Sequence, residues 1–290
     1  MAISTVNKTT PLIADGRIEL IREAATAARN YHFIGIGGCG MSGLAQVLIR
    51  QGQHVSGSDI QDSELIERLA AQGAEVWVGH DVRFMPEKLD CVVISAAVKE
   101  DNPELQEARR RHARVIKYAE LLGELSGSFT TMAVAGTHGK STTSAWTAWL
   151  LQRAGFSPSF VIGADVPQLG GGSGAGRGEY LIVEACEYDR SFLKLKPTVA
   201  AILNVEADHL DYYRDLDEII SAFGDFAELV GPTGLLVVNA DDPGVKGALA
   251  GRQLRCETFA LNNQADWRAE NLRYEDGHGS VSYTHLTLPT

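Results

Sequence analysis

A run of residues near the middle of the chain has the composition of a phosphate-binding loop. It reads Gly136-Thr-His-Gly-Lys-Ser-Thr-Thr143, between an apolar strand predicted at 130–135 and an apolar helix predicted at 145–154. Backbone amides at the helix start can cradle β- and γ-phosphates, Lys140 adds a positive charge, and the Ser141 hydroxyl can ligate Mg²⁺. The strict Gly-x4-Gly-Lys-Ser/Thr pattern fails, because Val134 holds the place of its first glycine. The strand–loop–helix context nevertheless predicts a nucleotide site, against the alternative of a plain helix cap with a solvated lysine.

Acidic residues follow the next two long apolar strands. A strand predicted at 180–183 runs into Glu184-Ala-Cys-Glu-Tyr-Asp189, and one at 199–204 runs into Glu206-Ala-Asp-His-Leu-Asp211. Ligand sites of α/β sheets collect at the carboxyl ends of strands, so these groups beside a phosphate loop predict a magnesium site. The alternative is that Asp208 and Asp211 cap the helix predicted at 216–229, with His209 on the surface.

A second glycine-rich loop lies nearer the N-terminus. Gly35-Ile-Gly-Gly-Cys-Gly-Met-Ser-Gly43 follows a strand predicted at 31–36 and opens a helix predicted at 44–50. Its glycines permit a tight turn and close approach to a pyrophosphate, and Asp59 stands about 20 residues on, where such folds place an acid for ribose hydroxyls. Alone, this loop favours an NAD-dependent oxidoreductase, with a nucleotide-sugar site or a structural turn as alternatives. A phosphate loop has no use in a simple dehydrogenase, which weakens the first interpretation.

The elements around these loops alternate in the manner of a doubly wound parallel sheet. Helices are predicted at 18–29, 63–72 and 103–112, and strands at 54–58, 74–78, 90–96, 115–118 and 160–162. A polar joint at 126–128 separates two such arrays. We predict an α/β protein with a Rossmann-like parallel-sheet domain at 28–125 and a P-loop-type ATP-binding domain at 129–281.

Composition excludes several classes of protein. The chain has 290 residues, 44% of them hydrophobic, and 37 acidic against 26 basic side chains give a formal charge of −11. This charge argues against nucleic acid as a partner. Apolar runs such as 199–203 are far shorter than the roughly 18 to 20 residues of a membrane span, and no secretory signal is apparent. The 4 cysteines have neither zinc-site nor disulfide spacing, which predicts a cytoplasmic protein.

The chain resembles the Mur ligase family over about residues 28–275. Four motifs carry the resemblance in the order and spacing of that family: the two glycine-containing loops, the acidic run 184–189 with Ser191-Phe-Leu193, and Asn204-Val-Glu-Ala-Asp-His209. The alanine-adding branch is the most similar. The resemblance implies that the γ-phosphoryl group of ATP passes to the lactyl carboxylate of UDP-N-acetylmuramate, and that L-alanine attacks the resulting acyl phosphate. A murein tripeptide-recycling ligase of the same family and a nucleotide-binding regulatory module stay open as alternatives.

The resemblance also implies residue roles. Catalysis would rest on Lys140, Glu184 and His209; Ser141 and Glu184 would ligate Mg²⁺ beside the phosphates, and His209 would help hold a second cation. The ATP phosphates would be held by Gly136, Thr137, His138, Gly139, Lys140, Ser141 and Thr142. The UDP-sugar would be held by Gly35, Gly37, Gly38, Gly40, Met41, Ser42, Ser58 and Asp59.

The sequence departs from the family in three places. Cys186 stands where the family often has Asp, and Tyr118-Ala-Glu120 where it often has Arg-Ala-Glu. Family members also continue into an adenine-contacting segment and a third domain, which are not in this sequence, and residues 282–290 look like a non-native tail. We therefore expect UDP-N-acetylmuramate binding with little turnover; amino-acid specificity and oligomeric state are left open.

Overall fold

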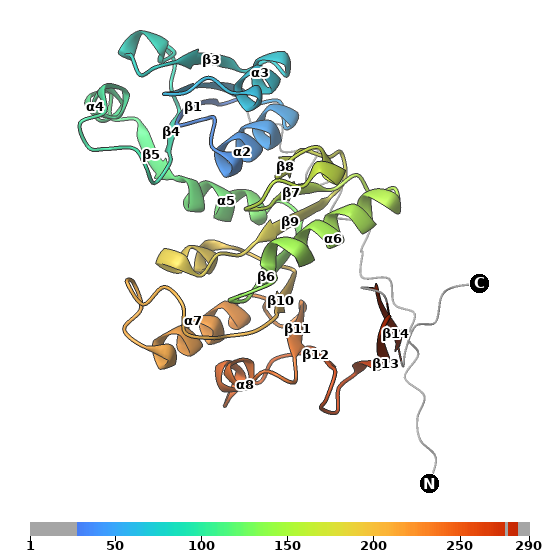
Figure 1. Cartoon of the computed structure of the whole chain (residues 1–290). Coiled ribbons are helices and arrows are strands. Elements are labelled where there is room, and N and C mark those ends of the chain that lie inside the picture. Colours follow the sequence, from blue (N-terminus) through green and yellow to red (C-terminus); the bar gives the residue numbers. More distant parts are fainter. Residues whose placement is uncertain (1–27, 276–277, 284–290) are drawn as a thin grey trace.

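The computed structural model describes residues 28–275 and 278–283. The helix predicted at 18–29 falls almost wholly outside them, as does the predicted tail apart from Ser282 and Tyr283, which belong to the last strand. The described chain is mixed α/β and builds two sheets, one from each half, joined by a helix (Figure 1). This arrangement confirms the predicted fold class.

The first sheet is parallel and five-stranded, in the order β3-β2-β1-β4-β5. Its strands are β1 (Asn30–Ile34), β2 (His54–Asp59), β3 (Glu75–Val78), β4 (Cys91–Ile94) and β5 (Arg114–Lys117). The chain moves outward from β1 to β3 and then returns to the other side of β1 for β4. The strand order thus reverses between β1 and β4, and ligands of open α/β sheets bind outside the strand ends at such a point.

Local sequence explains where the helices of this half begin. They are α2 (Cys39–Arg50), α3 (Glu64–Ala71), the short η1 (Val82–Phe84) and α4 (Pro103–Arg110). The Ser63 side chain accepts a hydrogen bond from the Ile66 amide at the start of α3. Asn102 accepts from the amides of Glu104 and Leu105, and Pro103 fills the first position of α4. Both are favoured helix starts, and the cap at Asn102 fixes where Glu104 lies.

The second sheet has nine strands in the order β14-β13-β12-β11-β10-β6-β9-β7-β8. They are β6 (Thr130–Ala135), β7 (Ser159–Val161), β8 (Ser173–Gly174), β9 (Tyr180–Glu184), β10 (Val199–Ile202), β11 (Leu235–Asn239), β12 (Cys256–Ala260), β13 (Trp267–Glu275) and β14 (His278–Tyr283). Strand β6 pairs in parallel with both β10 and β9. The loops that follow these three strands therefore meet at one edge of the sheet.

Helices pack against this sheet and support that edge. They are α6 (Lys140–Arg153), α7 (Leu216–Glu228) and α8 (Pro243–Leu249), with η2 (Pro167–Leu169) and η3 (Tyr188–Lys194). Phe192 of η3 is buried and stacks on Phe226 of α7 with ring centroids 4.9 Å apart. This contact holds the segment after β9 against α7. No helix within the described ranges is both long enough and apolar enough to cross a lipid bilayer.

The two halves are joined by α5 (Tyr118–Ser126), a helix that we did not predict from the sequence. It approaches η3 so closely that a Cβ on Gly123 would lie 2.3 Å from the Lys194 carbonyl oxygen. A second contact sets α2 against β7 and β8 (Figure 1). There Ser173 Oγ donates to the Cys39 carbonyl at 3.1 Å, and Arg68 donates to the Gly170 carbonyl at 2.9 Å. These two contacts pack the first half of the chain against the second.

Candidate functional site

The predicted phosphate loop joins β6 to α6, as the sequence indicates. Gly136 has φ 149° and Gly139, the residue that precedes α6, has φ 83°. Both values lie in the region that favours glycine, so the turn depends on these two residues. The amides at the start of α6 are left facing the loop, which is the arrangement that binds phosphate groups.

The segment after β10 is hydrogen-bonded to this loop. The Asn204 side chain accepts a hydrogen bond from the His138 amide at 2.7 Å and donates to the His138 carbonyl at 3.1 Å. The Glu206 amide donates to Thr137 Oγ1 at 2.9 Å, and the Thr137 amide donates to the Asn204 carbonyl at 3.0 Å. The loop is therefore held in shape before any nucleotide binds. Asn204 had no predicted role, although it opens a motif that the sequence displays.

Lys140 folds back over the loop and toward the strand ends. Its Nζ donates to the Gly136 carbonyl at 2.7 Å, to the Thr137 carbonyl at 3.2 Å and to Glu187 Oε1 at 3.1 Å. Glu187 is 2% exposed, so the pair of charges is shielded from solvent. The only cation of the loop thus faces the carboxylate that follows β9.

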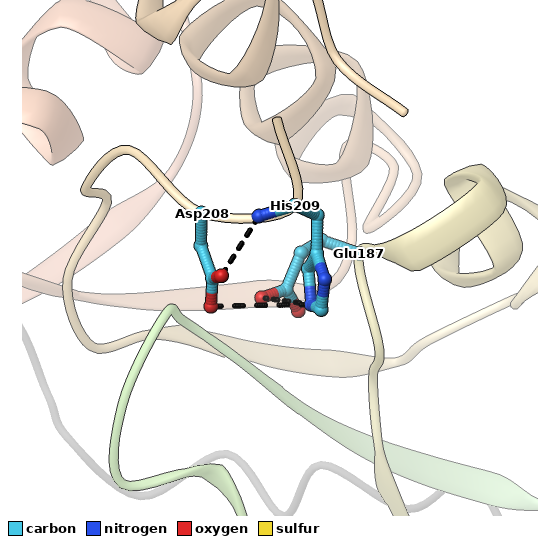
Figure 2. Close-up of side chains that lie close together, drawn as sticks. All are labelled: Glu187, Asp208 and His209. Atoms are coloured by element: carbon cyan, nitrogen blue, oxygen red, sulfur yellow. Dashed lines mark hydrogen bonds and ion pairs between the residues drawn. The ribbon is translucent and has the colours of Figure 1, made fainter. Parts of the chain in front are cut away.

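Glu187, Asp208 and His209 form a cluster that could hold a metal ion (Figure 2). One ligand atom from each lies within 4.8 Å of the others, and His209 Nε2 is 3.9 Å from both carboxylates. Glu187 Oε2 is buried and makes no hydrogen bond, although Lys140 Nζ is 3.0 Å away. A buried carboxylate oxygen without a hydrogen bond is costly unless another cation shares it. Carboxylate-rich clusters of this kind fit hard divalent cations such as Mg²⁺.

Strained backbone surrounds this cluster. Asp189, Arg190 and His209 have φ values of 53°, 51° and 52°, in the left-handed region that non-glycine residues rarely adopt. Tyr213 holds the backbone of the cluster in place, because its hydroxyl donates a hydrogen bond to the Glu187 carbonyl. Burial raises the pKa of Tyr213 to about 12, so this hydroxyl keeps its proton. The surrounding structure therefore holds both loops in conformations that place their side chains together.

Two residues predicted as metal ligands are placed differently. Glu184 Oε2 accepts a hydrogen bond from the Gly163 amide at 2.7 Å. Ser141 lies in the first turn of α6 and is partly buried. Neither belongs to the cluster of Glu187, Asp208 and His209. Glu187 and Asp208 were visible in the acidic runs of the sequence, but only the order of the strands brings them to His209.

The N-terminal half carries a separate pocket of about 650 Å³ at the carboxyl ends of its strands. It opens where the strand order reverses, as expected for this topology. The predicted residues Gly35, Gly37, Gly38 and Asp59 line it. Other lining residues come from the segments that follow β2, β3 and β4: Ile60, Gln61, Ser63, His80, Ser95, Ala97, Val98, Lys99, Asp101, Asn102 and Pro103.

Asp59 also shapes the glycine-rich loop. Its Oδ2 accepts a hydrogen bond from the Gly37 amide at 2.8 Å. The remaining predicted residues do not line the pocket. Gly40 packs against the Tyr118 ring, which a Cβ would meet at 2.8 Å. Met41, Ser42 and Ser58 are buried.

A buried carboxylate lies behind this pocket. Glu104 is wholly buried and accepts hydrogen bonds from Ser58 Oγ at 2.5 Å, from His32 Nε2 at 3.3 Å and from the Asp81 amide at 2.9 Å. Burial alone raises the pKa of Glu104. The hydrogen bonds from His32 and Ser58, with the charge of His32 and the Asp81 amide, outweigh it and bring the pKa below its ordinary value. Glu104 is therefore ionised. No sequence motif pointed to this network.

Each half of the chain matches the model of a known protein-family domain. Residues 30–130 match the model of the Mur ligase family catalytic domain, and residues 134–288 match the Mur ligase middle domain. UDP-N-acetylmuramate–L-alanine ligase of Syntrophotalea carbinolica is 44% identical over 248 residues, which are 86% of this chain and 54% of that protein. The enzyme of the same name from Pelobacter propionicus is 45% identical over 245 residues, 84% of this chain and 53% of that protein. The chain spans about half the length of these relatives.

Solved structures of ligases with related substrates are also similar to this chain. UDP-N-acetylmuramate:L-alanyl-γ-D-glutamyl-meso-diaminopimelate ligase of Neisseria meningitidis has a TM-score of 0.77 at 29% identity, covering 89% of this chain and 84% of that one. UDP-N-acetylmuramate–alanine ligase of Thermotoga maritima has a TM-score of 0.73 at 28% identity, covering 88% and 57%. One family accounts for the glycine-rich loop and the phosphate loop together, which an oxidoreductase does not. The chain belongs to the Mur ligase family.

Proposed function

We propose that this chain carries the UDP-sugar-binding and ATP-binding parts of a UDP-N-acetylmuramate–L-alanine ligase. Residues 28–125 would bind the UDP-sugar and residues 129–281 would bind ATP. The reaction would convert the lactyl carboxylate into an acyl phosphate and then into the amide of L-alanine, for peptidoglycan precursor synthesis. All 4 cysteines are unpaired, which suits an enzyme of the reducing cytoplasm.

The observation that carries this proposal is the meeting of Lys140 with the cluster of Glu187, Asp208 and His209 at the end of the phosphate loop. A carboxylate that attacks ATP brings two anions together, so positive charge must be fixed where the phosphoryl group moves. Lys140 can supply one such charge once its ammonium turns from Glu187 to the phosphates. The helix start at Lys140 and the amides of residues 137–139 would orient the β- and γ-phosphates.

The donor set fits a divalent cation, which we propose to be Mg²⁺. Glu187, Asp208 and His209 would hold it, and Ser141 and Glu184 would hold the ion that accompanies the ATP phosphates. Such ions neutralise phosphate charge and polarise the phosphoryl group. Around them, Tyr213 keeps the Glu187 backbone in place and Asn204 keeps the phosphate loop open.

Equilibrium binding to the 290-residue chain tests the proposal. Calorimetry should show binding of UDP-N-acetylmuramate and, at a separate site, of ATP in the presence of Mg²⁺. Lys140→Ala should weaken ATP binding by about a hundredfold or more and leave UDP-sugar binding within about twofold. Tight binding of NADH with no binding of the UDP-sugar would overturn the proposal.

The amino-acid substrate is tested on the complete open reading frame that contains these residues. Phosphate release should require UDP-N-acetylmuramate and L-alanine together. A second candidate is the murein tripeptide-recycling ligase, because the Neisseria meningitidis enzyme superposes well and this chain covers 84% of it. Release of phosphate with the tripeptide L-alanyl-γ-D-glutamyl-meso-diaminopimelate but not with L-alanine would favour that candidate.

A further inference from the structure

A second pocket, of about 380 Å³, lies at the free edge of β8. Strand β8 is the last in the order of the nine-stranded sheet, so within the described ranges one of its edges pairs with β7 and the other with no strand (Figure 1). The residues that line this pocket differ from those of the pocket beside Gly37, and none belongs to the phosphate loop or to the cluster of Glu187, Asp208 and His209. The pocket is therefore separate from both nucleotide sites.

Helices from both faces of the sheet form the walls of this pocket. Phe160 of β7 belongs to the core cluster that contains residues of α6, whereas Val161 belongs to the cluster that contains residues of α2. Successive residues of a strand point to opposite faces, so α6 and α2 cover opposite sides of the sheet. Gln152 of α6 and Gln46 of α2 both line the pocket. The pocket thus extends around the edge of β8 from one face to the other.

Ser173 of β8 presents two main-chain groups at this edge. It lies opposite Val161 in the antiparallel pairing of β8 with β7. The adjacent pair is hydrogen-bonded, because the Ile162 amide donates to the Gly172 carbonyl at 2.8 Å. Hydrogen-bonded and non-hydrogen-bonded pairs alternate along an antiparallel ladder, so the N–H and C=O of Ser173 point away from β7. No described residue bonds to either group, which leaves one donor and one acceptor for another extended chain.

Arg68 is the one charged side chain among the described residues that line the pocket. Its guanidinium carries five N–H donors. One donates to the Gly170 carbonyl at 2.9 Å and one to Glu64 at 3.4 Å. The bond to Gly170 holds the guanidinium beside the segment that leads into β8, and the other donors are left for an anion. A carboxylate is the group that fits this planar set of donors.

We propose that the pocket binds a short free peptide, extended and antiparallel to β8, with its C-terminal carboxylate at Arg68. One peptide residue accepts a hydrogen bond from the Ser173 amide and donates one to the Ser173 carbonyl, as a strand added to a sheet edge does. The direction follows from Gly170, which holds Arg68 and precedes β8 in the chain. The three residues from Gly170 to Ser173 correspond to roughly 10 Å of extended chain at about 3.3 Å per residue. A peptide of about two or three residues therefore fits the length and the volume.

The other polar groups of the pocket suit the same ligand. The side-chain amides of Gln46, Gln72 and Gln152 line it and, in the described part of the chain, have no hydrogen-bond partner. Carboxamides can both donate and accept, as the remaining peptide groups require. Arg68 and Gln46 come from the first half of the chain and Ser173 and Gln152 from the second, so a bound peptide contacts both halves. This inference does not depend on the proposed function.

Nuclear magnetic resonance of the ¹⁵N-labelled 290-residue chain, titrated with tri-L-alanine, tests the proposal. The peptide should give saturable shifts of the Ser173 amide and its neighbours. Tri-L-alanine amide should bind at least about tenfold more weakly, because it lacks the charge that Arg68 binds. Tri-L-alanine methylated on its middle nitrogen should bind at least about threefold more weakly, since it has no N–H there for Ser173. Equal affinity for the acid and the amide, or shifts confined to other parts of the chain, would overturn the proposal.

Three variants separate the role of Arg68 from its structural contact. Arg68→Gln should weaken peptide binding at least about tenfold, but it also removes the bond to Gly170. Gln72→Glu keeps Arg68 and places a competing carboxylate one helical turn away, so it should weaken binding about threefold or more. Arg50→Gln is the matched control, because it removes an equal charge from the end of α2 outside the pocket, and it should bind as the unaltered chain does. Equal losses for Arg68→Gln and Arg50→Gln, or full binding by Gln72→Glu, would exclude a carboxylate site at Arg68.

Discussion

The ammonium of Lys140 lies 3.0 Å from Glu187 Oε2 and 3.1 Å from Oε1, so the cation of the phosphate loop is paired with a carboxylate that also reaches His209. This pairing sets a partly buried ammonium against a buried carboxylate in the nucleotide-free chain. It also sets a competition, because phosphate oxygens and Glu187 both attract Lys140, and a divalent cation and Lys140 both attract Glu187. Nucleotide and cation are therefore expected to help each other to bind.

Glu187→Gln separates the two effects. Without the carboxylate, Lys140 no longer has to leave an ion pair, so ATP affinity measured in EDTA should rise about fivefold. The same change removes a charged ligand, so cation affinity should fall by at least about tenfold, as read from Mn²⁺ electron paramagnetic resonance. Glu206→Gln is the control, because it removes an equal charge from an exposed carboxylate that lies near His138 but does not belong to the cluster of Glu187, Asp208 and His209. A fall in ATP affinity in EDTA for Glu187→Gln would contradict the competition.

Asn204 is predicted to preserve the shape of the phosphate loop. Asn204→Ala removes both hydrogen bonds to the His138 backbone, and ATP affinity should fall about tenfold because the loop must then be ordered by the nucleotide. Asn204→Asp keeps the acceptor for the His138 amide but turns a carboxylate oxygen toward the His138 carbonyl and adds negative charge beside the phosphates, so it should lose at least as much affinity. Calorimetry with ATP and Mg²⁺ measures both. Equal affinity for the alanine variant and the unaltered chain would show that the loop holds itself.

Glu104 should make stability depend on pH. Its pKa is lower in the folded chain than the ordinary 4.5, so the folded state binds the proton less readily. The resulting stability is fully present above about pH 4.5 and is lost as the pH falls through the folded value. Glu104→Gln should cost about 1–3 kcal/mol at pH 7, and this difference should shrink as the pH is lowered below 4.5. Urea unfolding of both proteins from pH 7 to pH 3.5 measures it, and a difference that grows on acidification would contradict the assignment.

Local patterns predicted the parts of the site that are local in the chain. The phosphate loop needs only a strand, glycines at 136 and 139 and a helix, all in adjacent residues. The family resemblance pointed to Glu184 as the metal ligand in the acidic run 184–189. That Glu187 meets Asp208 and His209 depends on β6 lying between β9 and β10, which the sequence does not display. His80 and Glu104 belong to no motif, since a hydrogen-bond chain through Ser58 becomes visible only once β1, β2, β3 and α4 are placed.

Gly43 tests whether the contact between the two halves supports the site. A Cβ at this position of α2 would lie 2.5 Å from Ser173 Cβ on β8, closer than side-chain atoms can approach. Gly43→Ala favours the helix itself but must push α2 from β8, so we expect a net loss of about 1–3 kcal/mol in thermal or urea unfolding. The double variant with Ser173→Gly should recover most of that loss, because it removes the colliding Cβ. Failure of this rescue would show that the two halves do not pack as described.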